Sequence, residues 1–170
     1  ARDRSVGPEA EKEFRTALTL FPRHAASVSG LAGLLLEQNR TKDAKDVLDE
    51  ALRRDLDDPE LAYLRGLLSA STGDLEAADH AFAHAAELDP TSARPLEARG
   101  RLLYQRGDKL GAARLYREAL ERAPSAALAR TLGAILLHDL GDKPGARAAF
   151  ERSLQLEPRG PAADEVRALL

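Results

Sequence analysis

Residues 59–92 read PELAYLRGLLSASTGDLEAADHAFAHAAELDPTS, and the order of side chains in this stretch decides the fold. A proline opens the stretch, which suits the first turn of a helix. Leu61, Leu64 and Leu68 follow at the spacing of one helical face. Gly73 comes next, and glycine favours the left-handed conformation in which helices often end. The first half of the stretch therefore predicts a short helix that ends before Gly73.

A second helix is expected directly after this glycine. Asp74 is a residue type that caps helix N-termini, and Ala78, Phe82 and Ala85 then fall on one helical face. Pro90 follows the end of that face, where a proline interrupts no helical hydrogen bond. The small side chains allow the two helices to cross closely. The whole stretch therefore predicts two antiparallel helices joined by a tight turn.

The same pattern recurs every 34 residues along the chain. Five columns of residues keep this period without insertion or deletion. They are Pro22, Pro90, Pro124 and Pro158, with Leu56 at the remaining position; Asn39, Gly73, Gly107 and Gly141; Ala10, Ala44, Ala78, Ala112 and Ala146; Phe14, Leu48, Phe82, Tyr116 and Phe150; and Ala17, Ala51, Ala85, Ala119 and Ser153. Because one hairpin cannot bury its apolar faces alone, neighbouring hairpins are expected to stack.

The composition supports an all-helical chain. Hydrophobic residues make up 44% of the sequence, mostly as Leu and Ala, while aromatic residues are only 4% and Ile135 is the sole isoleucine. The absence of cysteine excludes disulfides and thiolate chemistry. No apolar run is long enough to span a membrane. The Ala- and Arg-rich, Lys-poor composition indicates a bacterial source.

The columns resemble the tetratricopeptide repeat (TPR) family, whose repeat carries Gly eighth, Ala twentieth, an aromatic twenty-fourth, Ala twenty-seventh and Pro thirty-second. The best matches are Gly66, Ala78, Phe82, Ala85 and Pro90, then Gly100, Ala112, Tyr116, Ala119 and Pro124. Ala32 and Ala134 replace the eighth-position glycine elsewhere, and Gly133 lies one residue early. The resemblance implies an all-α solenoid, a right-handed superhelix of antiparallel helix-turn-helix hairpins.

We expect a single array over residues 1–170. It comprises the second half of a repeat at 1–24, repeats at 25–58, 59–92, 93–126 and 127–160, and a capping helix or the start of a further repeat at 161–170. The half-repeat, and the absence of methionine, indicate a processed chain or a fragment of a longer protein. The compartment stays open, with the cytoplasm and the periplasm or exterior both allowed.

The resemblance also implies a concave groove lined by the first helix of each repeat. Carried over by register, the expected partner-binding residues are Tyr63, Leu67, Arg94, Glu97, Arg101, Tyr104, Ile135 and His138. Tyr and Arg are the residue types that most often anchor interfaces. The alternative is that Tyr63 and Tyr104 pack between first helices and that Arg94 is only solvated. One subfamily clamps the carboxylate-ended tails of chaperones, but here only Arg94 is compatible with that clamp.

Charge is unevenly distributed between the repeats. Residues 59–92 contain one basic and six acidic side chains, whereas residues 93–126 contain eight basic and four acidic ones. This difference either steers a bipolar partner or reflects ordinary solvation of exposed charges. The acidic total of −3 and the few aromatic residues argue against nucleic-acid binding.

The sequence gives little support for a catalytic, metal or cofactor site. His80 and His84 have helical metal-ligand spacing, but no third ligand is fixed beside them, so a solvated pair is the simpler interpretation. No nucleophile-elbow or phosphate-loop pattern is present, and no cofactor is expected.

The sequence therefore predicts a non-catalytic scaffold that binds a peptide or helix of another protein in the groove. The alternatives are the repeat region of a larger multidomain enzyme and an array that self-associates through its ends.

Overall fold

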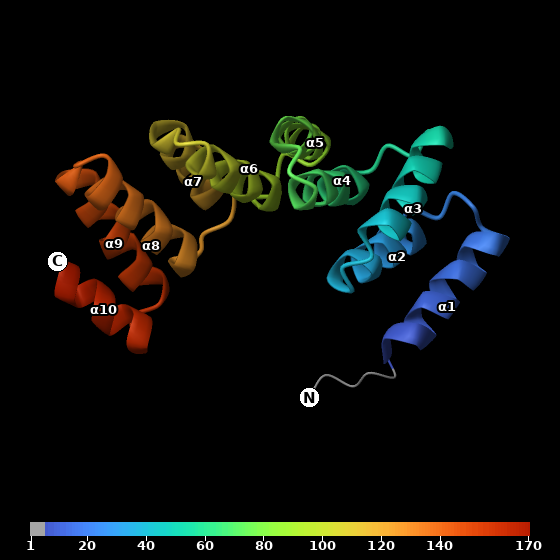
Figure 1. The fold of residues 1–170 in the computed structure, drawn as a ribbon. Coiled ribbons are helices and arrows are strands. Elements are labelled where there is room, and N and C mark those ends of the chain that lie inside the picture. Colours follow the sequence, from blue (N-terminus) through green and yellow to red (C-terminus); the bar gives the residue numbers. More distant parts are fainter. Residues whose placement is uncertain (1–5) are drawn as a thin grey trace. The chain divides into compact units, whose positions relative to one another are not determined.

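The computed structural model describes residues 6–170, and this part of the chain is all-α (Figure 1). Its elements are α1 (Val6–Leu20), α2 (Ala25–Glu37), α3 (Thr41–Arg53), α4 (Pro59–Ser71), α5 (Leu75–Leu88), α6 (Arg94–Gln105), α7 (Lys109–Arg122), α8 (Ala126–Ala134), the π-helical η1 (Ile135–Asp139), α9 (Lys143–Leu156) and α10 (Pro161–Leu169). Between residues 25 and 160 these helices form successive hairpins, α2–α3, α4–α5, α6–α7 and α8–η1–α9. The first five residues of the predicted half-repeat lie outside the described part.

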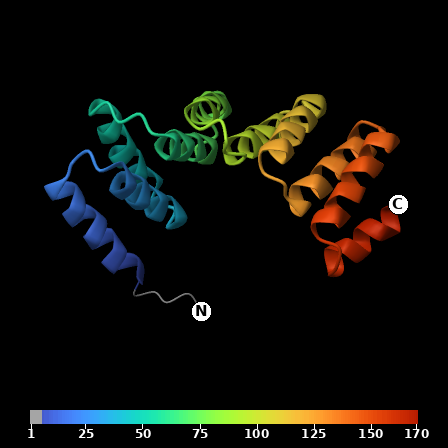
Figure 2. The ribbon, with the colours of Figure 1, turned by 180° about the vertical axis from the view of Figure 1, so that it is seen from behind.

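The chain divides into two compact units, residues 1–88 and residues 89–170. In the first unit, α2 pairs with α3 and α4 with α5, while α1 packs against α2 (Figure 1, Figure 2). In the second unit, α6 pairs with α7, α9 packs against α8 and η1, and α10 packs against α9. No helix in the described residues is long and apolar enough to cross a membrane.

The turn inside each hairpin uses one backbone conformation. Gly73, Gly107 and Gly141 have φ values of 84°, 87° and 67°, and Asn39 takes the same place at 61°. Asparagine is among the few non-glycine residues that tolerate this region. The aspartate after each glycine then caps the second helix, as Asp74 accepts a hydrogen bond from the Ala77 amide at 3.0 Å. The glycine column is therefore required by backbone geometry.

The alanine and aromatic columns form the contact between the helices of each hairpin. Ala78 and Ala112 are fully buried. The Phe82 ring lies against Gly66 of its own hairpin, so closely that a Cβ at Gly66 would stand 2.5 Å from the ring. Glycine at this position therefore makes room for the aromatic side chain of the second helix.

The fourth hairpin reaches the same contact by a different route. Gly133 lies eight residues after the helix cap Ser125, as Gly66 lies eight residues after its cap Asp58, and Gly133 faces the ring of Phe150. One residue more then separates Gly133 from the turn at Gly141. The π-helical turn η1 takes up this residue, with the Leu140 amide donating to the Ile135 carbonyl five residues earlier.

Candidate partner-binding site

Four of the predicted partner-binding residues lie on α6, at helical spacing along one face. Glu97, Arg101 and Tyr104 succeed one another at intervals of four and three residues, which places their side chains side by side. Arg94 and Arg101 are exposed, Glu97 is partly buried, and Tyr104 is 36% exposed. This face of α6 therefore offers a solvent-accessible row of charged and aromatic side chains.

A cavity of about 320 Å³ lies beside this row, between α6, α7, α8 and η1. Its lining combines three predicted residues with four others: Tyr104, Ile135 and His138, then Tyr116, Thr131, Ala134 and Asp139. Ile135 is only 4% exposed and forms an apolar wall, whereas His138 and Asp139 are exposed at the mouth. Three of the lining residues belong to η1, so the π-turn shapes this cavity.

Tyr104 is held in place by contacts on two sides. Its hydroxyl donates a hydrogen bond to Asp139 of η1 at 3.2 Å. The Lys109 ammonium lies 3.1 Å from the centroid of its ring and also donates to the Tyr104 carbonyl. A cation over an aromatic face is attracted by the ring's negative charge density. Tyr104 is therefore a pre-oriented aromatic surface at the cavity mouth.

Tyr116 also lines the cavity, although its place in the aromatic column predicts only a packing role. Its ring is 5% exposed, and its Cζ atom would stand 3.2 Å from a Cβ at Gly100. Burial raises the pKa of the Tyr116 phenol above its ordinary value; Arg101 opposes this rise, while Glu97 and Tyr104 add to it. The ring lies against Gly100 of α6 and lines the same cavity as Tyr104. The sequence signal for a binding role of Tyr116 was its hydroxyl, because the other residues of its column are Phe and Leu.

The two predicted residues of the first unit are more involved in packing. The Tyr63 ring lies 5.3 Å from the Phe82 ring at a tilt of 48°, a favourable aromatic arrangement. Leu67 packs against a buried cluster that includes Leu64 and Leu68. Both side chains are partly buried. Their positions agree with the packing alternative as well as with partner contact.

A second cavity, of about 400 Å³, lies between α1, α2 and α3, with apolar walls that include Leu18, Leu31 and Val47. Charged side chains near it are paired with one another. Glu11 accepts from Arg40 at 2.6 Å and from Arg15 at 2.8 Å, and these hydrogen bonds lower the pKa of Glu11 below its ordinary value.

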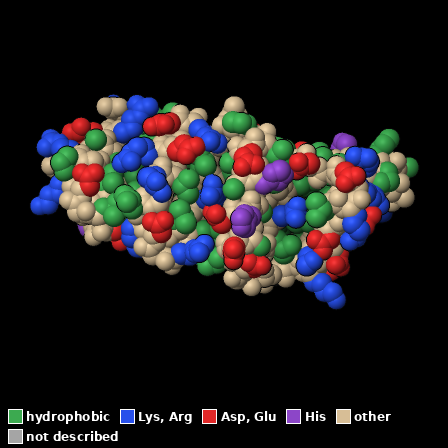
Figure 3. Space-filling view, turned by 90° about the horizontal axis from the view of Figure 1, so that it is seen from above, with side chains coloured by type: hydrophobic (Ala, Val, Ile, Leu, Met, Phe, Trp, Pro, Cys, Tyr) green, Lys and Arg blue, Asp and Glu red, His purple; other side chains and the backbone are tan. Residues whose placement is uncertain are grey.

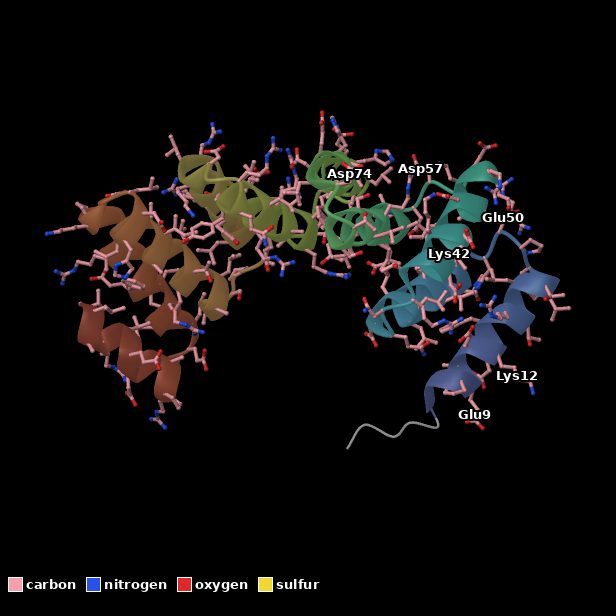
Figure 4. The ribbon with its side chains drawn as sticks, viewed as in Figure 1. Glu9, Lys12, Lys42, Glu50, Asp57 and Asp74 are labelled. Carbon is pink, nitrogen blue, oxygen red and sulfur yellow. The ribbon has the colours of Figure 1, made fainter. Side chains whose placement is uncertain are left out.

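Arg54 lines this cavity and donates to Glu50, which Figure 4 labels, and to the Pro22 carbonyl, both at 2.8 Å. Three charged residues that line this cavity, Arg15, Glu50 and Arg54, are therefore already engaged in ion pairs.

His80 and His84 have no third side chain of a metal-binding type grouped with them among the described residues. His84 instead makes a 2.7 Å hydrogen bond to Asp57, which lies in the connection between α3 and α4 (Figure 4). No group of three or more His, Cys, Asp or Glu side chains within residues 6–170 is placed to hold a metal ion. On the face seen in Figure 3, basic, acidic and hydrophobic side chains are interspersed.

Family comparison agrees with this architecture. Models described as tetratricopeptide repeat match residues 8–68, 59–92 and 97–164. The chain belongs to the tetratricopeptide repeat family, and its fold is the all-α solenoid of that family. This fold is typical of protein-interaction modules without catalytic activity of their own.

Solved structures with the same fold cover nearly the whole chain. A crystal structure of MamA is 18% identical, with a TM-score of 0.74 over 91% of this chain and 85% of that one. YrrB, described as a TPR protein with an unusual peptide-binding site, is 19% identical, with a TM-score of 0.70 over 96% of this chain and 84% of its own.

Pseudomonas aeruginosa pilF is 23% identical, with a TM-score of 0.68 over 92% of this chain and 72% of that chain. At these identities the likeness to the solved structures shows the fold. A search of the curated proteins found no match.

Proposed function

We propose that the chain is a non-catalytic interaction module that binds a peptide or helix of a partner protein on the first-helix face of its second unit. The observation that carries this proposal is the cavity between α6 and η1. Three predicted partner-binding residues, Tyr104, Ile135 and His138, line that cavity. The exposed Arg101 stands one helical turn before Tyr104 on the same face.

The chemistry of this face suits the proposal. Interfaces are commonly anchored by Tyr and Arg around an apolar pocket. Here Tyr104 supplies an oriented aromatic ring, Ile135 an apolar wall and Arg101 an exposed guanidinium. The first unit contributes less under this proposal, because Tyr63 and Leu67 are already engaged in packing. Arg94 and Glu97 extend the surface along α6. The peptide-binding site named in the description of YrrB is consistent with this use of the fold.

Affinity capture from a lysate of the source organism tests the proposal. The full chain is compared with an Arg101→Glu, Tyr104→Ala variant, and bound proteins are identified by mass spectrometry. The matched control is Arg114→Glu, Leu110→Ala on α7, where both side chains are also exposed and the charge change is the same. Circular dichroism checks that both variants fold.

We expect a bound partner to be lost by the α6 variant and kept by the α7 control. A peptide from that partner should bind the purified chain with the same preference. Loss in the α7 control alone contradicts the proposed face. Equal retention by both variants contradicts it as well.

Self-association is a second candidate function, favoured by the end of α1. Leu20 and Phe21 are 68% and 66% exposed, beside a cavity of about 540 Å³ that also involves Glu9 and Lys12 of α1 (Figure 4). Exposed apolar patches of this kind mark interaction surfaces. Light scattering over a range of concentrations tests this candidate. We expect oligomers that a Leu20→Ser, Phe21→Ser variant does not form; a strictly monomeric wild-type chain contradicts it.

A further inference from the structure

Tyr116 differs in one atom from the other aromatic residues of its column. Phe14, Phe82 and Phe150 have no hydroxyl, whereas Tyr116 has one. The Tyr116 ring passes under Gly100, and the ring carbon nearest to a Cβ built there is Cζ, which carries the hydroxyl. The phenolic oxygen therefore lies on the α6 side of the hairpin.

This hydroxyl has no hydrogen-bond partner among the residues that the structure describes. Tyr116 makes no hydrogen bond to any residue in the described range 6–170. No side-chain nitrogen or oxygen in that range is both sealed from solvent and without a partner. The Tyr116 oxygen must therefore remain open, and the cavity that Tyr116 lines is the space it opens into. A side chain that is 95% buried thus keeps a hydroxyl that is open to solvent and available to a ligand.

Arg101 provides a second available donor. Its guanidinium is exposed and forms no ion pair with any residue that the structure describes. By contrast, the nearby Asp139 already accepts from the Tyr104 hydroxyl. The second unit as a whole has fourteen basic and eleven acidic side chains, a net charge of +3. The phenol and the guanidinium can both donate hydrogen bonds. A carboxylate is a ligand group that can accept from both of them.

Resting on the proposed function, we infer that the cavity between α6 and η1 binds a carboxylate of the partner peptide, with the Tyr116 hydroxyl and the Arg101 guanidinium as its donors. The walls formed by Tyr104 and Ile135 fit an apolar side chain next to that carboxylate. The carboxylate belongs either to an Asp or Glu side chain or to the C-terminus of the peptide, since the two groups have the same donor requirements.

A random peptide library with free C-termini, selected on the full chain, provides the probe. Each enriched peptide is synthesised in its parent form, with its acidic side chains changed to amides, and with an amidated C-terminus. Affinities are measured for wild type and for Y104A, Y116F, R101Q and the control R114Q. Tyr116→Phe is the matched change, because phenylalanine already occupies this column in three other places. Arg114 is an exposed arginine of α7.

We expect acidic peptides to be enriched. Y116F and R101Q should each lower the affinity for the parent peptide by about tenfold or more, because each removes a hydrogen bond to a charged group. R114Q should leave the affinity unchanged. The amide form that removes the bound carboxylate should bind wild type and Y116F equally, and it identifies whether that carboxylate is a side chain or the C-terminus.

Two outcomes overturn the inference separately from the proposed function. Peptides whose binding requires Tyr104 but is unchanged in Y116F and R101Q contradict the carboxylate site and leave the interaction face standing. An equal loss for the acidic and amide forms in Y116F also contradicts it, because the hydroxyl then acts on packing. A library that yields no binder contradicts the proposed function itself.

Discussion

The hairpins α4–α5 and α6–α7 have the same backbone plan and different surfaces. In both, a glycine of the first helix faces an aromatic ring of the second, and a fully buried alanine lies at the crossing. Their net charges differ in sign, with six acidic side chains and one basic in residues 59–92 against four acidic and eight basic in residues 93–126. The repeat columns therefore determine the fold, and the positions between the columns determine what each hairpin can bind.

The aromatic column, which contains Phe82 and Tyr116, is an exception, because one of its residues also reaches the surface. Phe82 closes the α4–α5 hairpin with an apolar ring, whereas Tyr116 closes α6–α7 with a ring that carries an open hydroxyl. A Cβ at Gly66 would stand 2.5 Å from the Phe82 ring, but a Cβ at Gly100 would stand 3.2 Å from the Tyr116 ring. The α6–α7 contact is looser, and its packing residue reaches a surface cavity. A position that is structural in one repeat is a candidate binding position in the next.

The largest expected effect comes from the alanine column shared by both hairpins. Ala78→Leu and Ala112→Leu should each lower the free energy of unfolding by about 1–3 kcal/mol, because both sites are fully buried and an added isobutyl group overpacks the crossing. Urea denaturation measures the change. Ala148→Leu on the exposed side of α9 is the control. Unchanged stability in both column variants would contradict the assigned register.

Gly66→Ala and Gly100→Ala separate the two hairpins. Alanine gains about 0.5–1 kcal/mol over glycine inside a helix. At Gly66 the Phe82 ring must move, and overpacking should leave a net loss of about 1–2 kcal/mol. At Gly100 a shift of a few tenths of an ångström suffices, so the two effects should nearly cancel, to within about 0.5 kcal/mol. Equal losses in urea denaturation would show that the two contacts are equally tight.

A substitution of Lys109 measures how much the contact between Lys109 and Tyr104 stabilises the α6–α7 hairpin. The equivalent position in α4–α5 is Leu75, whereas Lys109 places its ammonium over Tyr104. Lys109→Leu should lower the free energy of unfolding by about 0.5–1 kcal/mol, the range for an exposed cation–π contact. Lys143→Leu, the same change at the equivalent exposed position of the fourth hairpin, is the control. An equal loss of stability in Lys109→Leu and Lys143→Leu would show that the contact between Lys109 and Tyr104 does not stabilise the fold.

The smallest expected effect appears only in alkaline solution. Because burial raises the pKa of Tyr116 in the folded chain, the folded state holds this proton more tightly than the unfolded state. The resulting stability is present below the ordinary tyrosine pKa and is lost as pH rises through the folded-state pKa. The free energy of unfolding should therefore decline less steeply above about pH 10 in Y116F than in wild type. Identical pH profiles would contradict this assignment.

Much of the hairpin structure could be predicted from sequence because local chemistry determines it. Gly73 and Asp74 specify a left-handed turn and a helix cap, and the structure has both. The all-α repeat fold followed from the columns and is confirmed by the family match. The π-turn η1 has no such local signal. It depends on Gly133 lying one residue early while Gly141 keeps the period, and only packing against Phe150 makes that shift consequential.

The candidate site could be predicted only in part. The repeat register predicted Tyr104, Ile135 and His138 as binding residues, and these three line one cavity. The register could not predict that Ile135 is almost buried. Tyr116 was assigned to packing, since its column is apolar in every other repeat. Whether its hydroxyl is satisfied depends on the placement of neighbouring side chains in three dimensions. The contacts Lys109 makes with Tyr104 are likewise a tertiary property.

The central claim is that a partner binds the first-helix face of the second unit. Hydrogen–deuterium exchange, measured by mass spectrometry on the full chain with and without a peptide selected from the library, tests it most directly. Binding should slow exchange in the C-terminal half of α6 and in α8 and η1, and leave α9 unchanged, because α6, α8 and η1 contribute lining residues to the cavity and α9 contributes none. Protection confined to α9, or to the first unit, would contradict the account.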